Sequence, residues 1–505
     1  MDDANAVIAP VKDDPHEEGA LRFWALKDGD CFVVSDSHGD ITGGPDGLFD
    51  ADTRLLSRLR LLIGGKRPTL LSSGVSADNV VFTFHGANRP LPPAGGRVVP
   101  PGVLHVERNR LIWRRRLYEH IRVTNHGLDE ILAPVAVEFA ADFRDMFEVR
   151  GEARSRRGQA GQAVTNGRSA AFAYQGLDGV TRTSVVAFSE PPQRLTADRA
   201  EFMAWFPRKG HFDLFIEAAE AADEPPDEHR FRRAAAEARR FMRAKGRHGC
   251  RPRSDSPTLN RWLAQSRADL ALLTTNLPTG RYPYAGIPWF STPFGRDGII
   301  SAWQMLLFDP GLARGVLAYL ASRQSRESSA FRDAQPGKIM HETRQGEMAA
   351  LGEVPFGLYY GGGGTPPLFI GVGGAYARRG GGPDFIPPLW PALEAAAGWL
   401  RDYGDSNGDG LIDYARAAET GLANQGWKDS YDSVFHADGR FPQGPIALVE
   451  VQGYAFAAWR TMADLSRRLD EAGDEDYGLR AETLRAAVED RFWMDATLTR
   501  LFNRF

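Results

Sequence analysis

Residues 117–127 read LYEHIRVTNHG, and this stretch indicates how the first part of the chain folds. Leu117, Ile121 and Val123 alternate with polar side chains, and only Glu119 interrupts the apolar face. Alternation with a period of two is typical of a β-strand that buries one face, and Asn-His-Gly then supplies a turn. The stretch therefore predicts a strand in an antiparallel β-sandwich.

Neighbouring stretches repeat the pattern. Residues 58–63 nearly alternate before Gly64-Gly65 turns the chain, and residues 134–139 form another apolar run. Many short strands separated by glycine and asparagine are typical of a sandwich of antiparallel sheets. We therefore expect a β-sandwich domain over residues 21–226, preceded by a polar, acidic and disordered segment over residues 1–20.

The character of the sequence changes near Asp227. Residues 227–246 are rich in alanine, arginine and glutamate, which predicts a helix ended by Gly246 within a helical linker over residues 227–256. Ser256 and Pro257 then suit the start of another helix. Further helices are expected at 257–274, 296–307, 309–323, 367–378, 385–402, 445–468 and 478–492. Roughly seven helices joined by loops rich in glycine and proline predict paired helices around an axis over residues 257–505.

Composition and charge exclude several classes of protein. The chain has 505 residues, enough for several domains, and 61 Lys+Arg against 65 Asp+Glu give a net charge of −4. Such a balance offers no electrostatic attraction to nucleic acid or to an anionic membrane. Two cysteines make no disulfide framework, and the acidic N-terminus lacks the pattern of a secretory signal. No apolar run is long enough to span a membrane. We therefore expect a cytoplasmic protein; its oligomeric state cannot be predicted.

Three clusters of aromatic, charged and amide residues lie in the expected loops of the second half. The first, residues 287–297, reads IPWFSTPFGRD. Asp297 could accept hydrogen bonds from two sugar hydroxyls while Trp289 stacks below the sugar. The alternative is that Asp297 is a favourable negative charge in the first turn of a helix.

The second cluster covers residues 338–347. His341 and Glu347 lack the second histidine of a zinc-protease pattern, so no metal is expected there. Glu342 and Arg344 are interpreted as ligands of sugar hydroxyls. The alternative is a solvated, charged loop.

The third cluster, residues 421–432, reads GLANQGWKDSYD. A carboxylate next to Trp427 and Lys428 suits an acid whose pKa the surroundings tune, since aromatic burial raises the pKa and an ammonium lowers it. The alternative is a solvated loop aspartate.

A further loop, residues 405–413, begins like a calcium-binding loop. Arg416 occupies the twelfth position, where such a loop needs a bidentate glutamate. A tight turn rich in Asx residues is therefore the favoured interpretation.

With these clusters the sequence resembles the bacterial-type amylo-α-1,6-glucosidase, or glycogen-debranching, family. The matching segments are residues 47–57, 142–151, 289–303, 337–347, 424–439 and 444–454. The resemblance extends from about Leu21 to Trp493 and implies an N-terminal antiparallel β-sandwich followed by an (α/α)6 barrel. It also implies cleavage of an α-glucosidic bond in glycogen-like α-glucans by inversion, without a metal or cofactor.

The resemblance implies roles for single residues. Asp429 would be the general acid that protonates the departing glycosidic oxygen. The residues that would line the glucose subsite are Trp289, Arg296, Asp297, Glu342, Gln425, Trp427, Lys428 and Glu450. An inverting enzyme also needs a second carboxylate about 6.5–9.5 Å from the first, across a water molecule. In this family that base is a glutamate near the end of the barrel.

The sequence departs from the family in two places. Twelve helices complete an (α/α)6 barrel, so about 100 residues or more would be missing, and the barrel is expected to be incomplete. No glutamate follows Trp493, and Glu450 lies where the family has a binding residue. Gly361–Gly364 also replace an acidic residue that the family places before its Thr-Pro-Leu-like segment.

Two other interpretations remain open. The chain could be a non-catalytic or truncated glucan-binding protein that lacks the general base. It could also be a related α/α-barrel glycosidase of the trehalase, glucoamylase or rhamnosidase kind, because the order of the two domains does not fix the sugar.

Overall fold

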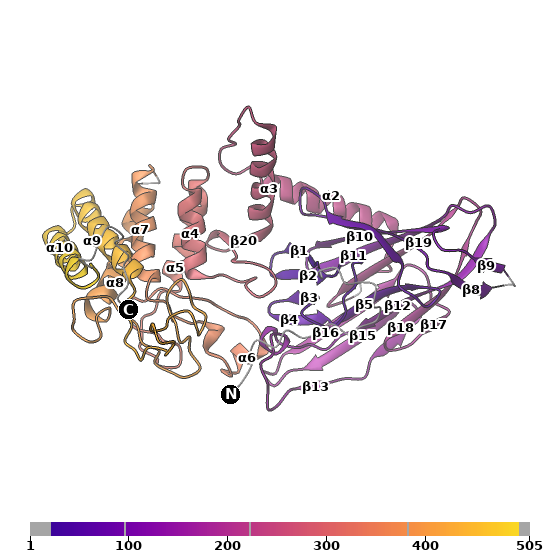
Figure 1. Ribbon diagram of the computed structural model, residues 1–505, viewed down its shortest axis with the longest axis horizontal. Coiled ribbons are helices and arrows are strands. Elements are labelled where there is room, and N and C mark those ends of the chain that lie inside the picture. Colours follow the sequence, from indigo (N-terminus) through magenta and orange to yellow (C-terminus); the bar gives the residue numbers. More distant parts are fainter. Residues whose placement is uncertain (1–21, 95–96, 222–223, 381–382, 494–505) are drawn as a thin grey trace.

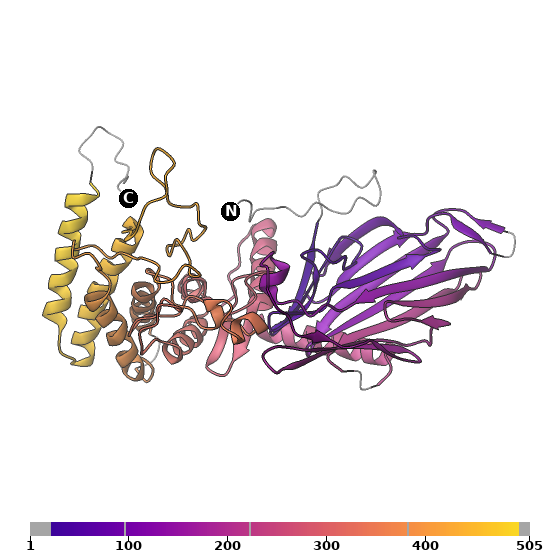
Figure 2. The same cartoon turned by 90° about the horizontal axis from the view of Figure 1, so that it is seen from below.

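The protein has a β-rich half and a helical half that lie side by side (Figures 1 and 2). The computed structural model describes residues 22–94, 97–221, 224–380 and 383–493. The segment 1–20, expected to be disordered, lies outside the described residues.

The β-rich half contains three larger antiparallel sheets. The strands are β1 (Trp24–Asp28), β2 (Cys31–Ser35), β3 (Gly47–Asp50), β4 (Thr53–Leu56), β5 (Arg58–Ile63), β6 (Thr69–Val75), β7 (Phe82–Ala87), β8 (Leu91–Ala94), β9 (Arg97–Val99), β10 (Leu104–Trp113), β11 (Arg116–Asn125), β12 (Ile131–Ala140), β13 (Gln159–Ala160), β14 (Val164–Asn166), β15 (Ser169–Gln175), β16 (Thr181–Phe188), β17 (Arg194–Leu195), β18 (Arg199–Phe206) and β19 (His211–Ala219). The largest sheet has the order β13-β15-β16-β19-β11-β10-β7-β6, with β14 beside β15. The second is β17-β18-β12-β5, the third is β1-β2-β3-β4, and β8 pairs with β9.

Strand β11 shows why the alternating pattern of residues 117–123 predicted a strand with one buried face. It lies between β10 and β19, and its buried residues alternate along the whole strand. The buried face has two polar residues, Glu119 and, at the end of the strand, Asn125; Glu119 accepts hydrogen bonds from Arg108 Nε at 2.6 Å and Arg110 Nη2 at 2.8 Å. A buried carboxylate is tolerated because two guanidinium groups replace its water.

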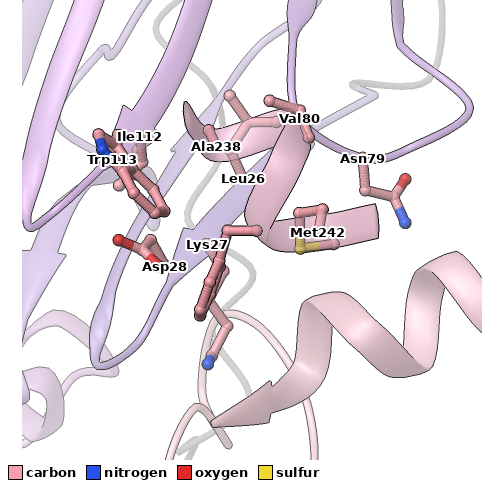
Figure 3. Close-up of a pocket in the computed structure, with 10 residues that line it drawn as sticks. Leu26, Lys27, Asp28, Asn79, Val80, Ile112, Trp113, Ala238 and Met242 are labelled. Carbon is pink, nitrogen blue, oxygen red and sulfur yellow. The ribbon is translucent and has the colours of Figure 1, made fainter. Parts of the chain in front are cut away.

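Helix α2 (Glu228–Lys245) joins the two halves, and its small apolar face packs on β10 and β11. A cavity of about 10 Å³ lies near the C-terminal end of α2. Figure 3 shows the residues that line it, with the Lys27 side chain extending away from the others. Lys27 Nζ donates to Thr275 Oγ1 at 2.8 Å, and burial lowers the pKa of this amine to about 7. Lys27 therefore ties the sandwich to the first hairpin of the helical half.

The helical half consists of two layers. Its elements are α3 (Pro257–Leu273), β20 (Thr274–Leu277), β21 (Gly280–Pro283), α4 (Gly295–Met305), α5 (Pro310–Ser322), α6 (Glu347–Ala350), the 3-10 turn Pro355–Gly357, α7 (Thr365–Arg378), α8 (Ile386–Asp402), α9 (Val449–Leu469) and α10 (Asp474–Arg491). Helices α4, α7 and α9 are successive neighbours, and α5 packs on α4, α8 on α7 and α10 on α9 (Figure 1). The predicted order, a β-sandwich followed by paired helices, is confirmed.

Two helices begin four positions from their expected starts: α9 begins at Val449 instead of 445, and α10 was expected from residue 478. It begins at Asp474, directly after Gly473 in the left-handed conformation. Asp474, Glu475 and Asp476 occupy the first turn, where negative charge is favourable, so three acidic residues extend the helix toward its N-terminus.

Within the ranges described, the helices are either too short or too polar to cross a membrane.

Candidate active site

The three expected clusters meet at one end of the helical half. Helices α4, α7 and α9 each begin there, and the long segment between α8 and α9 lies beneath α7 and α9 in Figure 1. Antiparallel bridges join Phe294 to Glu342 and Glu342 to Tyr359. The first two clusters therefore lie side by side, next to the segment that precedes α7.

Arg296 connects two of the clusters. It lies in the first turn of α4, and its Nη2 donates to Asp429 Oδ2 at 2.9 Å. Its Nη1 donates to the carbonyl of Gly426. The Asp429 side chain stays 39% exposed, so a ligand can reach its carboxyl group.

Asp297 belongs to the same site. Burial raises the pKa of this carboxyl, and the negative charge of Asp429 raises it further, while Arg296 acts in the opposite direction. The structure therefore brings Arg296, Asp297 and Asp429 close enough to influence one another.

His341 was not predicted as a site residue. It is buried, and its ring lies 5.6 Å from Phe294 and 5.9 Å from Tyr359, centroid to centroid. Burial, followed by the charge of Arg296, lowers its pKa to about 3, so the imidazole is neutral at pH 7. Its Nδ1 has no hydrogen-bond partner among the described residues. The only sequence signal was its place beside Glu342.

Gln425 lies four positions before Asp429 in the same loop and contacts two other segments. Its Nε2 donates to Asp333 Oδ2 at 3.3 Å, and its backbone carbonyl accepts from the Gly363 amide at 3.2 Å. Its Oε1 is buried and, within the described part of the chain, unpaired. Asp333, which the sequence did not single out, also accepts from Tyr359 Oη at 2.6 Å, so one buried carboxylate organises both loops.

Glu450, in the first turn of α9, lies close to the turn at Gly426. A β-carbon placed on Gly426 would lie 3.6 Å from Glu450 Oε1. The charge of Glu450 also helps to raise the pKa of Tyr454, although burial is the larger cause. Glu450 therefore faces the turn that Arg296 holds.

The two predicted tryptophans differ in their surroundings. Trp427 is 56% exposed, and Lys428 Nζ lies 5.2 Å from its ring centroid. Trp289 instead packs against an apolar cluster of the β-rich half that includes Phe32 and Met146. The Trp289 ring thus belongs to the contact between the two halves, whereas that of Trp427 is open to a ligand.

The cluster around Glu342 is not a solvated loop, so that alternative was wrong. Glu342 and Arg344 are both buried, and Arg344 Nε donates to Glu342 Oε2 at 2.9 Å. Burial raises the pKa of Glu342, while Arg344 opposes the shift. Arg344 Nη1 also donates to Asp52 Oδ1 of the sandwich at 3.1 Å, so the ion pair with Glu342 continues into the β-rich half.

Two of the glycines before α7 fill space where side chains do not fit. A β-carbon on Gly361 would lie 2.2 Å from Tyr359 Oη, and one on Gly362 would lie 2.8 Å from Thr365 Oγ1. A side chain would therefore collide at Gly361 and Gly362, whereas Gly363 and Gly364 would make only ordinary contacts, the nearest at 3.7 and 3.6 Å.

The turn at residues 405–413 has the Asx-rich form that the sequence favoured. Asp405 accepts hydrogen bonds from the amides of Asp409 at 2.9 Å and Gly410 at 2.8 Å. Asp413 accepts from Ser406 Oγ at 2.7 Å. These bonds from backbone amides and a serine hydroxyl to aspartate side chains are those of an Asx-rich turn.

Comparison with known proteins agrees with this picture. Residues 26–217 match the N-terminal domain of (some) glycogen debranching enzymes. The sandwich is of the glycogen-debranching type. The resemblance predicted from the sequence is confirmed, and the match covers almost the whole β-rich half.

Solved structures support the fold of both halves together. A bacterial glucoamylase complexed with acarbose has a TM-score of 0.55 at 9% identity, covering 94% of this chain and 69% of its own. A putative kojibiose phosphorylase from the human microbiome has a TM-score of 0.51 at 9% identity, covering 95% and 69%. No curated protein matches the sequence. The sandwich is thus followed by helices that are arranged as in these two structures.

Proposed function

We propose that this protein hydrolyses α-glucosidic bonds of glycogen-like, branched α-glucans by inversion, with Asp429 as the general acid. The observation that carries the proposal is the Arg296–Asp429 pair at the start of α4, beside the buried carboxyl of Asp297. The proposal is also supported by the contact between two loops that the resemblance singled out, one with Arg296 and one with Asp429.

In this proposal Asp429 gives its proton to the oxygen of the leaving group. The carboxylate that forms is then stabilised by Arg296, whose Nη2 already lies 2.9 Å from Oδ2. A charge-assisted hydrogen bond that strengthens as the proton leaves lowers the barrier for this step.

Sugar hydroxyls would bind the polar groups around the acid. Gln425 Oε1 is buried and has no hydrogen-bond partner among the described residues. A buried acceptor without a partner costs free energy, and a sugar hydroxyl that donates to it would remove this cost. Asp297, Glu342 and Glu450 would accept further hydrogen bonds. The exposed Trp427 ring would stack on a sugar face, with Lys428 beside it.

The decisive experiment measures glucose release from a branched limit dextrin, with α-1,6, α-1,4 and α,α-1,1 glucosides as a linkage panel. Asp429→Asn is expected to abolish hydrolysis and to leave the unfolding midpoint unchanged, since the side-chain amide oxygen of this variant can still accept a hydrogen bond from Arg296. Asp432→Asn is the matched control, because Asp432 is an exposed carboxylate three positions along the same loop.

Near-normal turnover by Asp429→Asn would remove Asp429 from the acid role. The anomer released first should be β-glucose, because inversion changes the configuration of the α-linked carbon. An initial release of α-glucose would contradict the inverting mechanism.

A second candidate is glucan binding without hydrolysis. It is favoured by the Trp427 ring, which is 56% exposed and can stack on a sugar face without any catalytic step. Calorimetric binding of isomaltotriose without any glucose release would support it, and loss of that binding in Trp427→Ala would assign it to the same site.

A further inference from the structure

One turn of the β-sandwich contacts the loop that carries Glu342. Asp52 lies between β3 and β4 at a φ of 63°, and its carbonyl accepts a hydrogen bond from the Met146 amide at 2.8 Å. Its carboxylate accepts from the Gln345 amide at 2.9 Å and from Arg344 Nη1 at 3.1 Å. The turn therefore places a negative charge directly against the loop that carries Glu342.

Arg344 is held from both halves of the molecule. Besides Asp52, it donates from Nε to Glu342 Oε2 at 2.9 Å and from Nη2 to the Trp289 carbonyl at 2.7 Å. The guanidinium carbon also lies 5.5 Å from the ring centroids of Phe147 and of Phe294. These contacts leave the planar group one orientation.

Stability alone does not favour such an arrangement. The side chains of Asp52, Arg344 and Glu342 are 7%, 1% and 7% exposed. Desolvating buried charges costs about as much as their attraction returns, and apolar replacements are often equally stable or more stable. What the arrangement does supply is a fixed direction for each carboxylate.

The direction matters most for Glu342. Its backbone is fixed by the bridges to Phe294 and Tyr359, so the rotation of its side chain is the remaining freedom. The bond from Arg344 Nε removes that freedom, and Asp52 in turn orients Arg344.

We propose that Asp52 is a positioning residue of the glucose subsite: through Arg344 it sets the orientation and the charge of the Glu342 carboxylate. This inference rests on the proposed function, which assigns Glu342 to sugar binding. The sandwich is then a part of the subsite, and the helical half does not form it alone.

The first test is the affinity for isomaltotriose, measured by calorimetry. Asp52→Ala is expected to weaken binding by about tenfold or more, because Arg344 and Glu342 lose their orientation. Glu353→Gln is the matched control. It breaks another ion pair between the halves, Arg154 Nε to Glu353 Oε2 at 2.7 Å, which does not contact Glu342. A folded Asp52→Ala protein that binds as tightly as this control would overturn the proposal.

The second test needs no ligand. The charged groups that act on the carboxyl of Glu342 are Arg344 and Arg150, which lower its pKa, and Asp52, which raises it in addition to the larger effect of burial. Asp52→Asn keeps the size of the side chain but removes its charge, so the pKa of Glu342 is expected to fall. Titration by carboxyl-carbon NMR, with the signal assigned from Glu342→Gln, measures this shift.

An unchanged pKa of Glu342 in Asp52→Asn would overturn the proposal even if Asp52→Ala does not fold. If the wild-type protein binds no oligosaccharide, the proposed function fails. The titration then decides separately whether Asp52 acts on Glu342.

Discussion

Among the individual residues, Arg296 shows how much one side chain can organise. Its planar guanidinium bonds the Gly426 carbonyl and the Asp429 carboxylate, which belong to one loop, from the first turn of α4. A lysine offers a single ammonium group and could not reproduce this two-sided contact. The spacing of 133 positions between Arg296 and Asp429 explains why the sequence indicated two clusters but not their pairing.

His341 leads to a prediction about pH. In the unfolded chain its pKa is near 6.5, and in the folded protein burial lowers it to about 3. Between these values the unfolded state binds a proton that the folded state does not, so folding stability falls as the pH falls. At pH 5 the loss due to His341 is about 2 kcal/mol.

The variant His341→Gln cannot titrate, so it should lose about 2 kcal/mol less than the wild type between pH 7.5 and pH 5. Urea unfolding at the two pH values measures this difference. The same loss in both proteins would show that His341 does not remain neutral in the folded state.

Among the secondary-structure elements, the start of α4 determines where Arg296 and Asp297 lie. A β-carbon on Gly295 would lie 2.0 Å from the Met340 carbonyl oxygen, and one on Gly298 would lie 2.6 Å from Tyr282 Oη. At these two positions α4 lies so close to Met340 and to Tyr282 that only glycine fits. The close approach at Gly295 also holds the loop that carries His341, because the Gly295 amide donates to the His341 carbonyl at 2.7 Å.

Gly295→Ala is therefore expected to destabilise the protein by about 1–3 kcal/mol, because the methyl group meets a backbone carbonyl that cannot turn aside. Denaturant unfolding measures the change. The displacement of α4 should also weaken any oligosaccharide binding.

Gly453→Ala is the matched control for this prediction. Gly453 is inside α9, and nothing lies within 4 Å of an added β-carbon. This variant should be more stable than the wild type by about 0.5–1 kcal/mol, because alanine favours the helix. Equal effects of the two variants would show that the close approach at Gly295 does not constrain α4.

Most helices and strands could be predicted because their patterns are local. Alternation indicated β11, and glycine and proline separated the helices, as α5 (Pro310–Ser322) against the expected 309–323 illustrates. The site was predictable only as clusters of suitable residue types. Asp333 gave no local signal, because its role depends on Tyr359 and Gln425 at distant positions. The Asp52–Arg344 bond joins residues 292 positions apart, which periodicity cannot reveal.

The whole molecule has an apolar groove at the opposite end of α4 from the proposed active site. A cavity of about 460 Å³ lies there among α3, α4 and α5, and Trp262 on its rim is 63% exposed. Exposed apolar surfaces of this kind favour association. We expect the protein to self-associate as its concentration rises.

Sedimentation velocity over a concentration series tests this expectation. Trp262→Gln should shift the distribution toward the monomer, whereas Arg261→Gln, an exposed neighbour on the same helix, should not. A wild-type protein that stays monomeric throughout the series would contradict the expectation.

The two halves form one molecule through many polar contacts. Glu347 of α6 accepts from Tyr174 Oη at 2.8 Å and from Arg154 Nη1 at 3.1 Å, and Tyr284 Oη donates to Asp30 at 2.6 Å. Together with the Asp52 contacts, they hold the sandwich beside the loop that carries Glu342. The whole molecule, and not the helical half alone, therefore provides the proposed glucan site.

The most direct measurement is the crystal structure of the Asp429→Asn variant soaked with isomaltotriose. The account predicts a glucose unit within hydrogen-bond distance of Arg296 and Asp297, with the glycosidic oxygen facing position 429. Isomaltotriose bound elsewhere, or absent at a saturating concentration, would contradict it.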